Sequence, residues 1–158
     1  ICMNFSRYSD VCIRRNAIRS LDFSICNLYP ADSVKEIGCN YETCMKSMDD
    51  NPGFECCKFI PYAAGSGQWY KNSCYIRRAG IDKDLKWCKY MVSADATVGL
   101  YDECYKAVAE SKEDIGICSM VEKADVRDDC LLGLATEKTD CDTITNQEKK
   151  GGCQKKIV

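Results

Sequence analysis

The chain has 158 residues, 14 of them cysteine, and 22 Lys and Arg against 24 Asp and Glu give a formal net charge of −2. A cysteine content this high indicates a disulfide scaffold in an oxidising compartment. The sequence contains no histidine, which excludes serine-histidine and cysteine-histidine catalysis, and the balanced charge argues against nucleic acid as a partner. No apolar run approaches the ~20 residues of a membrane span, so we expect no transmembrane segment.

The N-terminal end carries two signals. The chain begins with Ile1 rather than Met, which we interpret as a mature secreted chain after signal removal or as a fragment. Asn4 opens an Asn-Phe-Ser sequon and is therefore a candidate N-glycosylation site.

Five cysteines, the leading cysteines, each follow a polar or acidic pair and precede a larger side chain. In four cases an alanine lies five residues later. Leu100, Cys104 and Val108 share one helical face, which predicts an α-helix around the leading cysteine. Their spacing of 26 to 32 residues matches the length of a helix-turn-helix repeat. The leading cysteines are Cys12, Cys44, Cys74, Cys104 and Cys130.

A second class, the trailing cysteines, has a hydrophobic residue three places later. Asp22, Asp84 and Asp114 stand four places before three of them, and Asp is a favoured helix N-cap. The pattern therefore predicts that a trailing cysteine sits about one turn into a short helix. The six pairs are Cys2/Phe5, Cys26/Tyr29, Cys57/Ile60, Cys88/Met91, Cys118/Val121 and Cys141/Ile144.

Together these patterns predict an all-α fold, a disulfide-stapled and solenoid-like array of short antiparallel helix pairs. We expect one domain over residues 1–158, with about five repeats of 23–32 residues and a half-repeat at each end. Turns are expected at Gly80 and over residues 111–114, and the longest irregular stretch is expected near residues 61–67.

The C-terminal part resembles a known repeat. Residues 127–135, RDDCLLGLA, and residues 140–144, DCDTI, resemble a cysteine-rich repeat of secreted or surface proteins of small-genome archaea. That repeat has the form Arg-Asp-x-Cys-Tyr-x-x-Leu-Ala, then Asp, then Cys-x-x-Ile. The similarity is close over residues 100–144 and fainter over 8–91. The resemblance implies an extracellular helical array and supplies no catalytic residues.

Two disulfide registers fit the alternation of the two classes. The first joins each leading cysteine to the following trailing one and is favoured by its more uniform separations. The second joins each trailing cysteine to the next leading one. Both leave Cys39 and Cys56 over, which we expect to bond to each other. The first register is Cys12–Cys26, Cys44–Cys57, Cys74–Cys88, Cys104–Cys118 and Cys130–Cys141. The second is Cys2–Cys12, Cys26–Cys44, Cys57–Cys74, Cys88–Cys104, Cys118–Cys130 and Cys141–Cys153.

The registers differ in what they imply for Cys2 and Cys153. In the first register both are left over, so Cys153 of one subunit and Cys2 of the next could form an inter-subunit disulfide in a head-to-tail filament. Alternatively, the two bond to each other. In the second register every cysteine closes within the chain, which describes a self-contained secreted module.

Three other features are candidate sites. The adjacent Cys56 and Cys57 are assigned to two different structural bridges rather than to a redox switch or a soft-metal site. Asp125, Asp128 and Asp129 are interpreted as solvated charges near a helix start rather than calcium ligands. We expect no cofactor or metal. Trp69 and Tyr70 beside the Gly65-Ser66-Gly67 loop are the best candidates for an exposed interface.

The leading functional hypothesis is a secreted or cell-surface structural protein, without enzymatic activity, that assembles with itself into a homopolymer. The alternative is a monomeric secreted binding module or effector that uses one face of the helical array to bind a partner protein.

Overall fold

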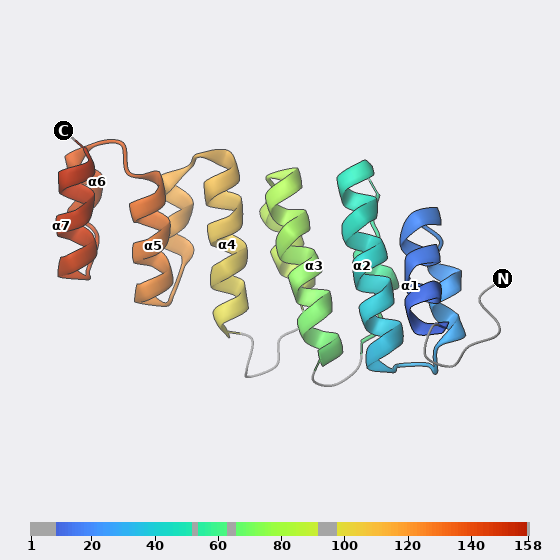
Figure 1. The fold of residues 1–158 in the computed structure, drawn as a ribbon. Coiled ribbons are helices and arrows are strands. Elements are labelled where there is room, and N and C mark those ends of the chain that lie inside the picture. The colour runs from blue at the N-terminus through green and yellow to red at the C-terminus, as the bar shows by residue number, and fades with distance from the viewer. Residues whose placement is uncertain (1–8, 52–53, 63–65, 92–97, 158) are drawn as a thin grey trace. The chain divides into compact units, whose positions relative to one another are not determined.

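A computed structural model of the chain describes residues 9–51, 54–62, 66–91 and 98–157, and every secondary-structure element within these ranges is a helix (Figure 1). The expected all-α, disulfide-rich fold is confirmed. Cys2, Asn4 and Gly65 lie outside the described residues, so the expectations for them stay predictions. Within the described ranges no helix is long and apolar enough to cross a membrane.

Long α-helices alternate with short helices along the described residues, and the short helices are 3-10 helices except for the last, which is α-helical. The contacts divide the molecule into two compact units, Ile1–Cys74 (unit 1) and Tyr75–Val158 (unit 2). The α-helices are α1 (Ser9–Ser20), α2 (Val34–Asp50), α3 (Ser66–Asp82), α4 (Val98–Lys112), α5 (Ala124–Leu134), α6 (Lys138–Cys141) and α7 (Gln147–Lys156). The 3-10 helices are η1 (Phe23–Leu28), η2 (Cys57–Phe59), η3 (Leu85–Tyr90) and η5 (Ile115–Met120).

One turn motif joins an α-helix to its 3-10 helix three times. In α4, the backbone N–H of Asp114 donates to the Ala109 carbonyl over 3.0 Å, and the intervening Glu113 has a left-handed φ of 56°. This is a Schellman ending of the helix. Its equivalents are Asp22 to Ala17 at 3.2 Å after α1 and Asp84 to Ala79 at 3.1 Å after α3. The alanine five residues after the leading cysteine is therefore the buried last-turn residue whose carbonyl the turn satisfies.

The aspartate that ends this turn also starts the 3-10 helix. The side chains of Asp22, Asp84 and Asp114 each accept a hydrogen bond from the backbone N–H two residues later, at 2.9 to 3.0 Å. The predicted Asp N-caps are confirmed. In all five trailing positions that the structure describes, the hydrophobic residue three places later is buried, and its N–H donates to the cysteine carbonyl. These residues are Tyr29, Ile60, Met91, Val121 and Ile144.

In unit 2 two buried aspartates, each in an α-helix, bind the backbone that follows the next short helix. Asp102, near the start of α4, accepts the backbone N–H groups of Glu122 at 2.8 Å and Lys123 at 3.0 Å, just after η5. Asp128 in α5 accepts the N–H of Thr145 at 3.0 Å and of Asn146 at 2.7 Å, and also the Thr145 hydroxyl at 2.8 Å. We call these two residues the aspartate latches. Both side chains are 1% exposed, so the expectation of a solvated Asp128 is wrong.

A side-chain hydrogen bond joins successive hairpins, and its donor is the residue three places before a leading cysteine. Lys71 Nζ donates to the Ile60 carbonyl at 3.1 Å, and the Tyr101 hydroxyl donates to the Met91 carbonyl at 3.1 Å. Arg127 makes the equivalent, longer contact of 3.4 Å to the Val121 carbonyl. Each acceptor is the carbonyl of the residue that ends a 3-10 helix, so structurally equivalent carbonyls are used in three consecutive repeats.

The disulfides also join consecutive repeats, and the favoured first register is wrong. Four trailing cysteines bond to the next α-helix instead of closing their own hairpins. For Cys88 and Cys118 the Schellman turn and the aspartate cap already close the hairpin. The pairs of this kind are Cys57–Cys74, Cys88–Cys104, Cys118–Cys130 and Cys141–Cys153. They agree with the second register.

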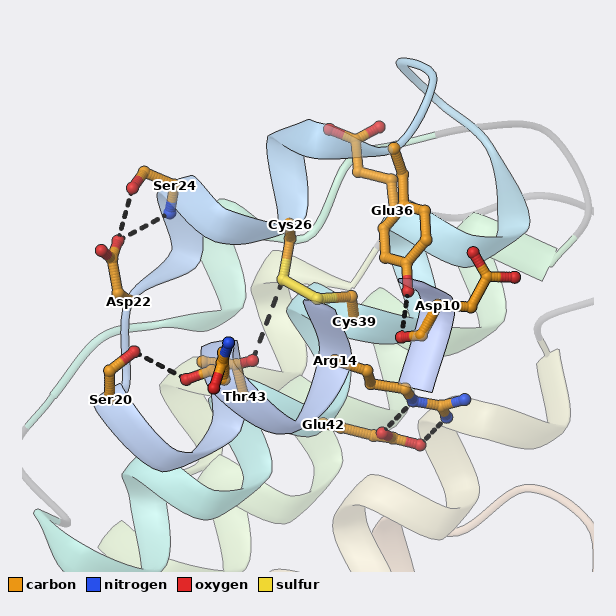
Figure 2. The surroundings of a disulfide bond; sticks show 12 residues. Asp10, Arg14, Ser20, Asp22, Ser24, Cys26, Glu36, Cys39, Glu42 and Thr43 are labelled. Carbon is orange, nitrogen blue, oxygen red and sulfur yellow. Dashed lines mark hydrogen bonds and ion pairs between the residues drawn. A yellow bond between two sulfur atoms is a disulfide. The ribbon is translucent and has the colours of Figure 1, made fainter. Parts of the chain in front are cut away.

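Two disulfides of unit 1 depart from both registers. Cys26 of η1 bonds to Cys39 of α2, and Cys44 of α2 bonds to Cys56. The expected Cys39–Cys56 bond is therefore wrong, as is the alternative Cys26–Cys44. The reason is that α2 carries two cysteines. The one nearer its N-terminus meets η1 beside Thr43 (Figure 2), which leaves the other for the segment before η2.

Two smaller expectations also need correction. Cys153 bonds to Cys141 within the chain, so it is not available for an inter-subunit disulfide. Gly80 lies inside α3 rather than in a turn, and the turn follows at Lys83. A Cβ at Gly80 would stand 3.3 Å from Ser111 Oγ and 3.7 Å from the Ala107 carbonyl, so the glycine permits a close approach of α4.

Candidate functional site: aromatic surfaces and a sulfur cluster

A three-ring cluster in unit 1 contains the predicted interface residues. Trp69 and Tyr70 lie in the first turns of α3, and Tyr41 comes from the middle of α2. The Tyr41 ring lies 4.9 Å from that of Tyr70 and 6.4 Å from that of Trp69, and the Trp69 and Tyr70 rings meet edge to face at 5.1 Å. Trp69 remains 53% exposed. We call this group the tryptophan cluster.

Charged groups flank the tryptophan cluster in the sequence. Next to Tyr41, Glu42 forms a two-pronged ion pair with Arg14 of α1 (Figure 2). Next to Tyr70, Lys71 is held by the Ile60 carbonyl, and burial lowers the pKa of its ammonium group from 10.5. These contacts fix residues on both sides of the cluster, so its rings are presented from anchored helix segments.

A second aromatic group in unit 1 consists only of phenylalanines. Phe23 of η1 lies 5.1 Å from Phe59 of η2 and 6.1 Å from Phe54, measured between ring centroids. Phe54 and Phe59 are 37% and 43% exposed, and the Lys58 ammonium lies 5.4 Å from the Phe59 centroid. This phenylalanine cluster gives unit 1 a second apolar surface.

Unit 2 uses its tryptophan differently. Trp87 is only 7% exposed, and its indole N–H donates to Asp82 over 2.8 Å. The Arg78 guanidinium and the Lys86 ammonium each lie 5.1 Å from the Trp87 ring, and Arg78 also pairs with Asp82. Because its polar group and its faces are occupied, Trp87 is a packing residue, in contrast to Trp69.

The disulfides of α2, η2 and α3 form a sulfur cluster inside unit 1. Cys44 is bonded to Cys56, and Cys57 to Cys74, yet Cys44 Sγ and Cys74 Sγ lie only 3.2 Å apart. Among the described residues, Cys44, Cys56 and Cys74 are the only group of three potential metal ligands whose ligand atoms all lie within 4.8 Å of one another. All three sulfurs are in disulfides, and metals bind the thiolate form. The two bonds made by Cys56 and Cys57 match the assignment of this adjacent pair to different bridges.

A pocket in unit 2 offers a further surface. It has a volume of about 330 Å³ and lies between η5, α5 and α6, over the buried Leu131. Its charged groups are Arg127, which reaches the Val121 carbonyl, and Asp140, whose carboxylate accepts the N–H groups of Thr136 and Glu137. Both are already engaged within the fold, so the pocket is a weaker candidate than the exposed rings of unit 1.

Several of these features were missed from the sequence. Asp102 and Asp128 both stand two residues before a leading cysteine, and the buried Asn72 stands at the same position before Cys74. The recurrence of Asp or Asn at this position was a signal for a buried cap. The contact between Tyr41 and the pair Trp69 and Tyr70 had no local signal, since it depends on how α2 and α3 pack.

Comparison of the chain with protein-family models, curated protein sequences and solved structures found no significant match.

Proposed function

We propose that this protein is a binding module of an oxidising, extracytoplasmic compartment, and that the tryptophan cluster of unit 1 contacts a partner protein. The proposal is for a binding rather than a catalytic role. The disulfide content supports an oxidising location, because such bonds are rarely kept in a reducing cytosol.

The exposure of Trp69 is the observation that carries this proposal. A tryptophan that is 53% exposed leaves a large apolar area in water, at a cost that a binding partner would remove. Tyr and Trp are enriched at interface hot spots, since they bury much area for few rotatable bonds. The ring contacts to Tyr41 and Tyr70 order Trp69 before binding, which lowers the entropic cost of association.

Self-association without inter-subunit disulfides is the second candidate. It is favoured by α1, where Val11 is 50% exposed beside a shallow depression of about 560 Å³ that Arg15 and Arg19 also line. A second copy of the chain could cover this face. The test is sedimentation over a range of concentrations, in which Val11→Asp lowers any self-association.

The binding proposal is tested with oxidised protein carrying an affinity tag. Wild type and Trp69→Ala are each incubated with the extracytoplasmic fraction of the source cells, and the retained proteins are compared by quantitative mass spectrometry. We expect one partner to be retained by wild type and lost at least about tenfold with Trp69→Ala, which corresponds to about 1.4 kcal/mol of binding free energy.

Leu28→Ala is the matched control, because Leu28 is also apolar, in unit 1 and 67% exposed, but lies outside the tryptophan cluster. Both variants are first shown to keep the wild-type thermal midpoint. Retention of the same proteins at the same level by wild type and Trp69→Ala would overturn the proposal.

A further inference from the structure

The sulfur cluster of unit 1 brings two disulfides closer together than their structural role requires. Cys44 and Cys74 belong to different bonds, yet their sulfurs are 3.2 Å apart, within van der Waals contact. The other two sulfurs belong to Cys56 and Cys57, which are neighbours in the chain. Cys44 and Cys74 therefore each have a bonded partner and a second sulfur in contact.

We propose that this cluster is an internal thiol–disulfide exchange site. In it, a small thiol converts the pairs Cys44–Cys56 and Cys57–Cys74 into the pairs Cys44–Cys74 and Cys56–Cys57. The reaction class is disulfide isomerisation, in which the thiol acts as a catalyst and is returned unchanged.

The first step begins at Cys57, the only sulfur of the four whose residue is more than 0% exposed, at 4%. A monothiolate of the glutathione class attacks Cys57 Sγ, and the bond from Cys57 to Cys74 breaks. Cys57 is left in a mixed disulfide with the small thiol, and Cys74 leaves as a thiolate. This thiolate is the group 3.2 Å from Cys44 Sγ.

Two further exchanges complete the cycle. The Cys74 thiolate attacks Cys44 Sγ, which forms the Cys44–Cys74 bond and releases Cys56 as a thiolate. The Cys56 thiolate attacks the adjacent Cys57 Sγ, which forms the Cys56–Cys57 bond and releases the small thiolate. Two disulfides are present before and after, so there is no net oxidation or reduction.

Isomerisation would change a surface of unit 1. In the present pairing Cys56 ties the segment before η2 to α2, and Cys57 ties η2 to α3. In the exchanged pairing α2 and α3 are linked directly, and the segment between them loses both ties. This segment carries Phe54 and Phe59, which in the present pairing pack against Phe23. The exchange is therefore a thiol-operated switch that frees two of the three rings of the phenylalanine cluster.

The sharpest test removes one cysteine so that exchange needs no added thiol. In Cys56→Ser, the Cys44 thiol faces Cys74 of the remaining Cys57–Cys74 bond. We expect this thiolate to displace Cys57, so that after acid quenching, unfolding and alkylation the label divides between Cys44 and Cys57. Label at Cys44 alone would overturn the proposal.

Cys130→Ser is the matched control, because it frees Cys118, and among the described residues Cys118 and Cys130 belong to no sulfur cluster like that of Cys44, Cys56 and Cys74. We expect its label at Cys118 only. Label spread over several cysteines of this control would mean non-specific scrambling and would also overturn the proposal.

A measurement on the wild-type chain tests the proposal even if the variants misfold. Oxidised wild type is incubated with catalytic reduced glutathione, quenched with acid and digested after Lys and Arg. In the present pairing the peptide 47–58, which contains Cys56 and Cys57, is cross-linked to two others. Exchange releases this peptide without a cross-linked partner and with a mass two hydrogens below that of its dithiol form. If the peptide is not released while the Cys118–Cys130 disulfide stays intact, the proposed exchange is contradicted.

Discussion

Units 1 and 2 are built from the same repeat but secure it by different chemistry. In unit 2 the position two residues before a leading cysteine is a buried aspartate that binds backbone N–H groups just after the next short helix, η5 or α6. In unit 1 the same position before Cys12 and Cys44 holds Asp10 and Glu42, which instead form ion pairs with Lys35 and Arg14. Before Cys74, at the end of unit 1, it holds the buried Asn72.

Proline explains this difference. The two donors of each latch directly follow the buried hydrophobic residue that lies three places after a trailing cysteine, as Glu122 and Lys123 follow Val121. In unit 1 the first of these residues is Pro30 or Pro61, and proline has no backbone N–H to donate. Without a latch, unit 1 carries the additional cysteines Cys39 and Cys56. In the α2–η2 hairpin, the Cys44–Cys56 disulfide is present where the latched hairpins of unit 2 have an aspartate, so a latch and a disulfide are alternative means of holding a hairpin.

The largest expected effect comes from removing one disulfide in each unit. Cys44–Cys56 and Cys118–Cys130 both span 12 residues, so each double serine variant should lose about 3 kcal/mol by the loop-entropy model. The local consequences should differ. Amide exchange in residues 54–59 should rise strongly in the first variant, whereas η5 should stay protected in the second because Asp102 still holds its end. Equal loss of amide protection in both variants would contradict the claim that the two units are held by different interactions.

The next effect concerns the latch itself. Asp128→Asn replaces a carboxylate that accepts three hydrogen bonds with a group that has one acceptor oxygen, so we expect a loss of about 2 kcal/mol in urea unfolding. Glu42→Gln is the control at the equivalent position of unit 1 and should cost less than about 1 kcal/mol, because its ion pair is partly exposed. A larger loss of unfolding free energy for Glu42→Gln than for Asp128→Asn would contradict the stabilising role of the latch.

Acid should weaken the latch of unit 2. Burial alone would raise the pKa of Asp128, but hydrogen bonds from Thr145 and Asn146 outweigh it and hold the pKa below the ordinary 3.8. A lowered folded-state pKa gives stability that is present above pH 3.8 and is lost as the pH falls through the folded-state value. The difference in unfolding free energy between wild type and Asp128→Asn should therefore be constant near neutral pH and shrink in acid. A difference that grows in acid would contradict this assignment.

The smallest effect is a stabilisation at the shared turn. Glu113 adopts a φ of 56°, which strains any residue with a Cβ. Glu113→Gly should raise stability by about 0.5 kcal/mol, since relief of that strain exceeds the added entropy of the unfolded chain. Calorimetry should show a small increase in the thermal midpoint, and Glu110→Gly, inside α4, should lower it by comparison.

The local parts of this structure could be predicted from the sequence, whereas the pairings between repeats could not. Asp84, Cys88 and Met91 lie within one turn motif, so their spacing alone indicated a short helix capped by aspartate, which the structure shows to be a 3-10 helix. The register failed because it rested on the assumption that a disulfide must close its own hairpin. The Schellman bond from Asp114 to Ala109 already does so, and only tertiary packing decides which helix faces Cys118.

The candidate site was predicted in part for the same reason. Trp69 could be identified as an exposed residue beside a loop, and the structure confirms its exposure. Its contact with Tyr41 joins α2 to α3 and leaves no trace in local spacing. The same holds for the contact between Cys44 and Cys74, since each belongs to a different helix and a different disulfide.

Disulfide mapping around Cys118 tests most directly the central claim that disulfides join consecutive repeats. Digestion of the oxidised protein after Lys and Arg separates Cys104, Cys118 and Cys130, because Lys106, Lys112, Lys123 and Arg127 lie between them. The structure predicts that the Cys118 peptide is recovered linked to the Cys130 peptide. Recovery of the Cys118 peptide linked to the Cys104 peptide would show that each disulfide closes its own hairpin and would contradict the account.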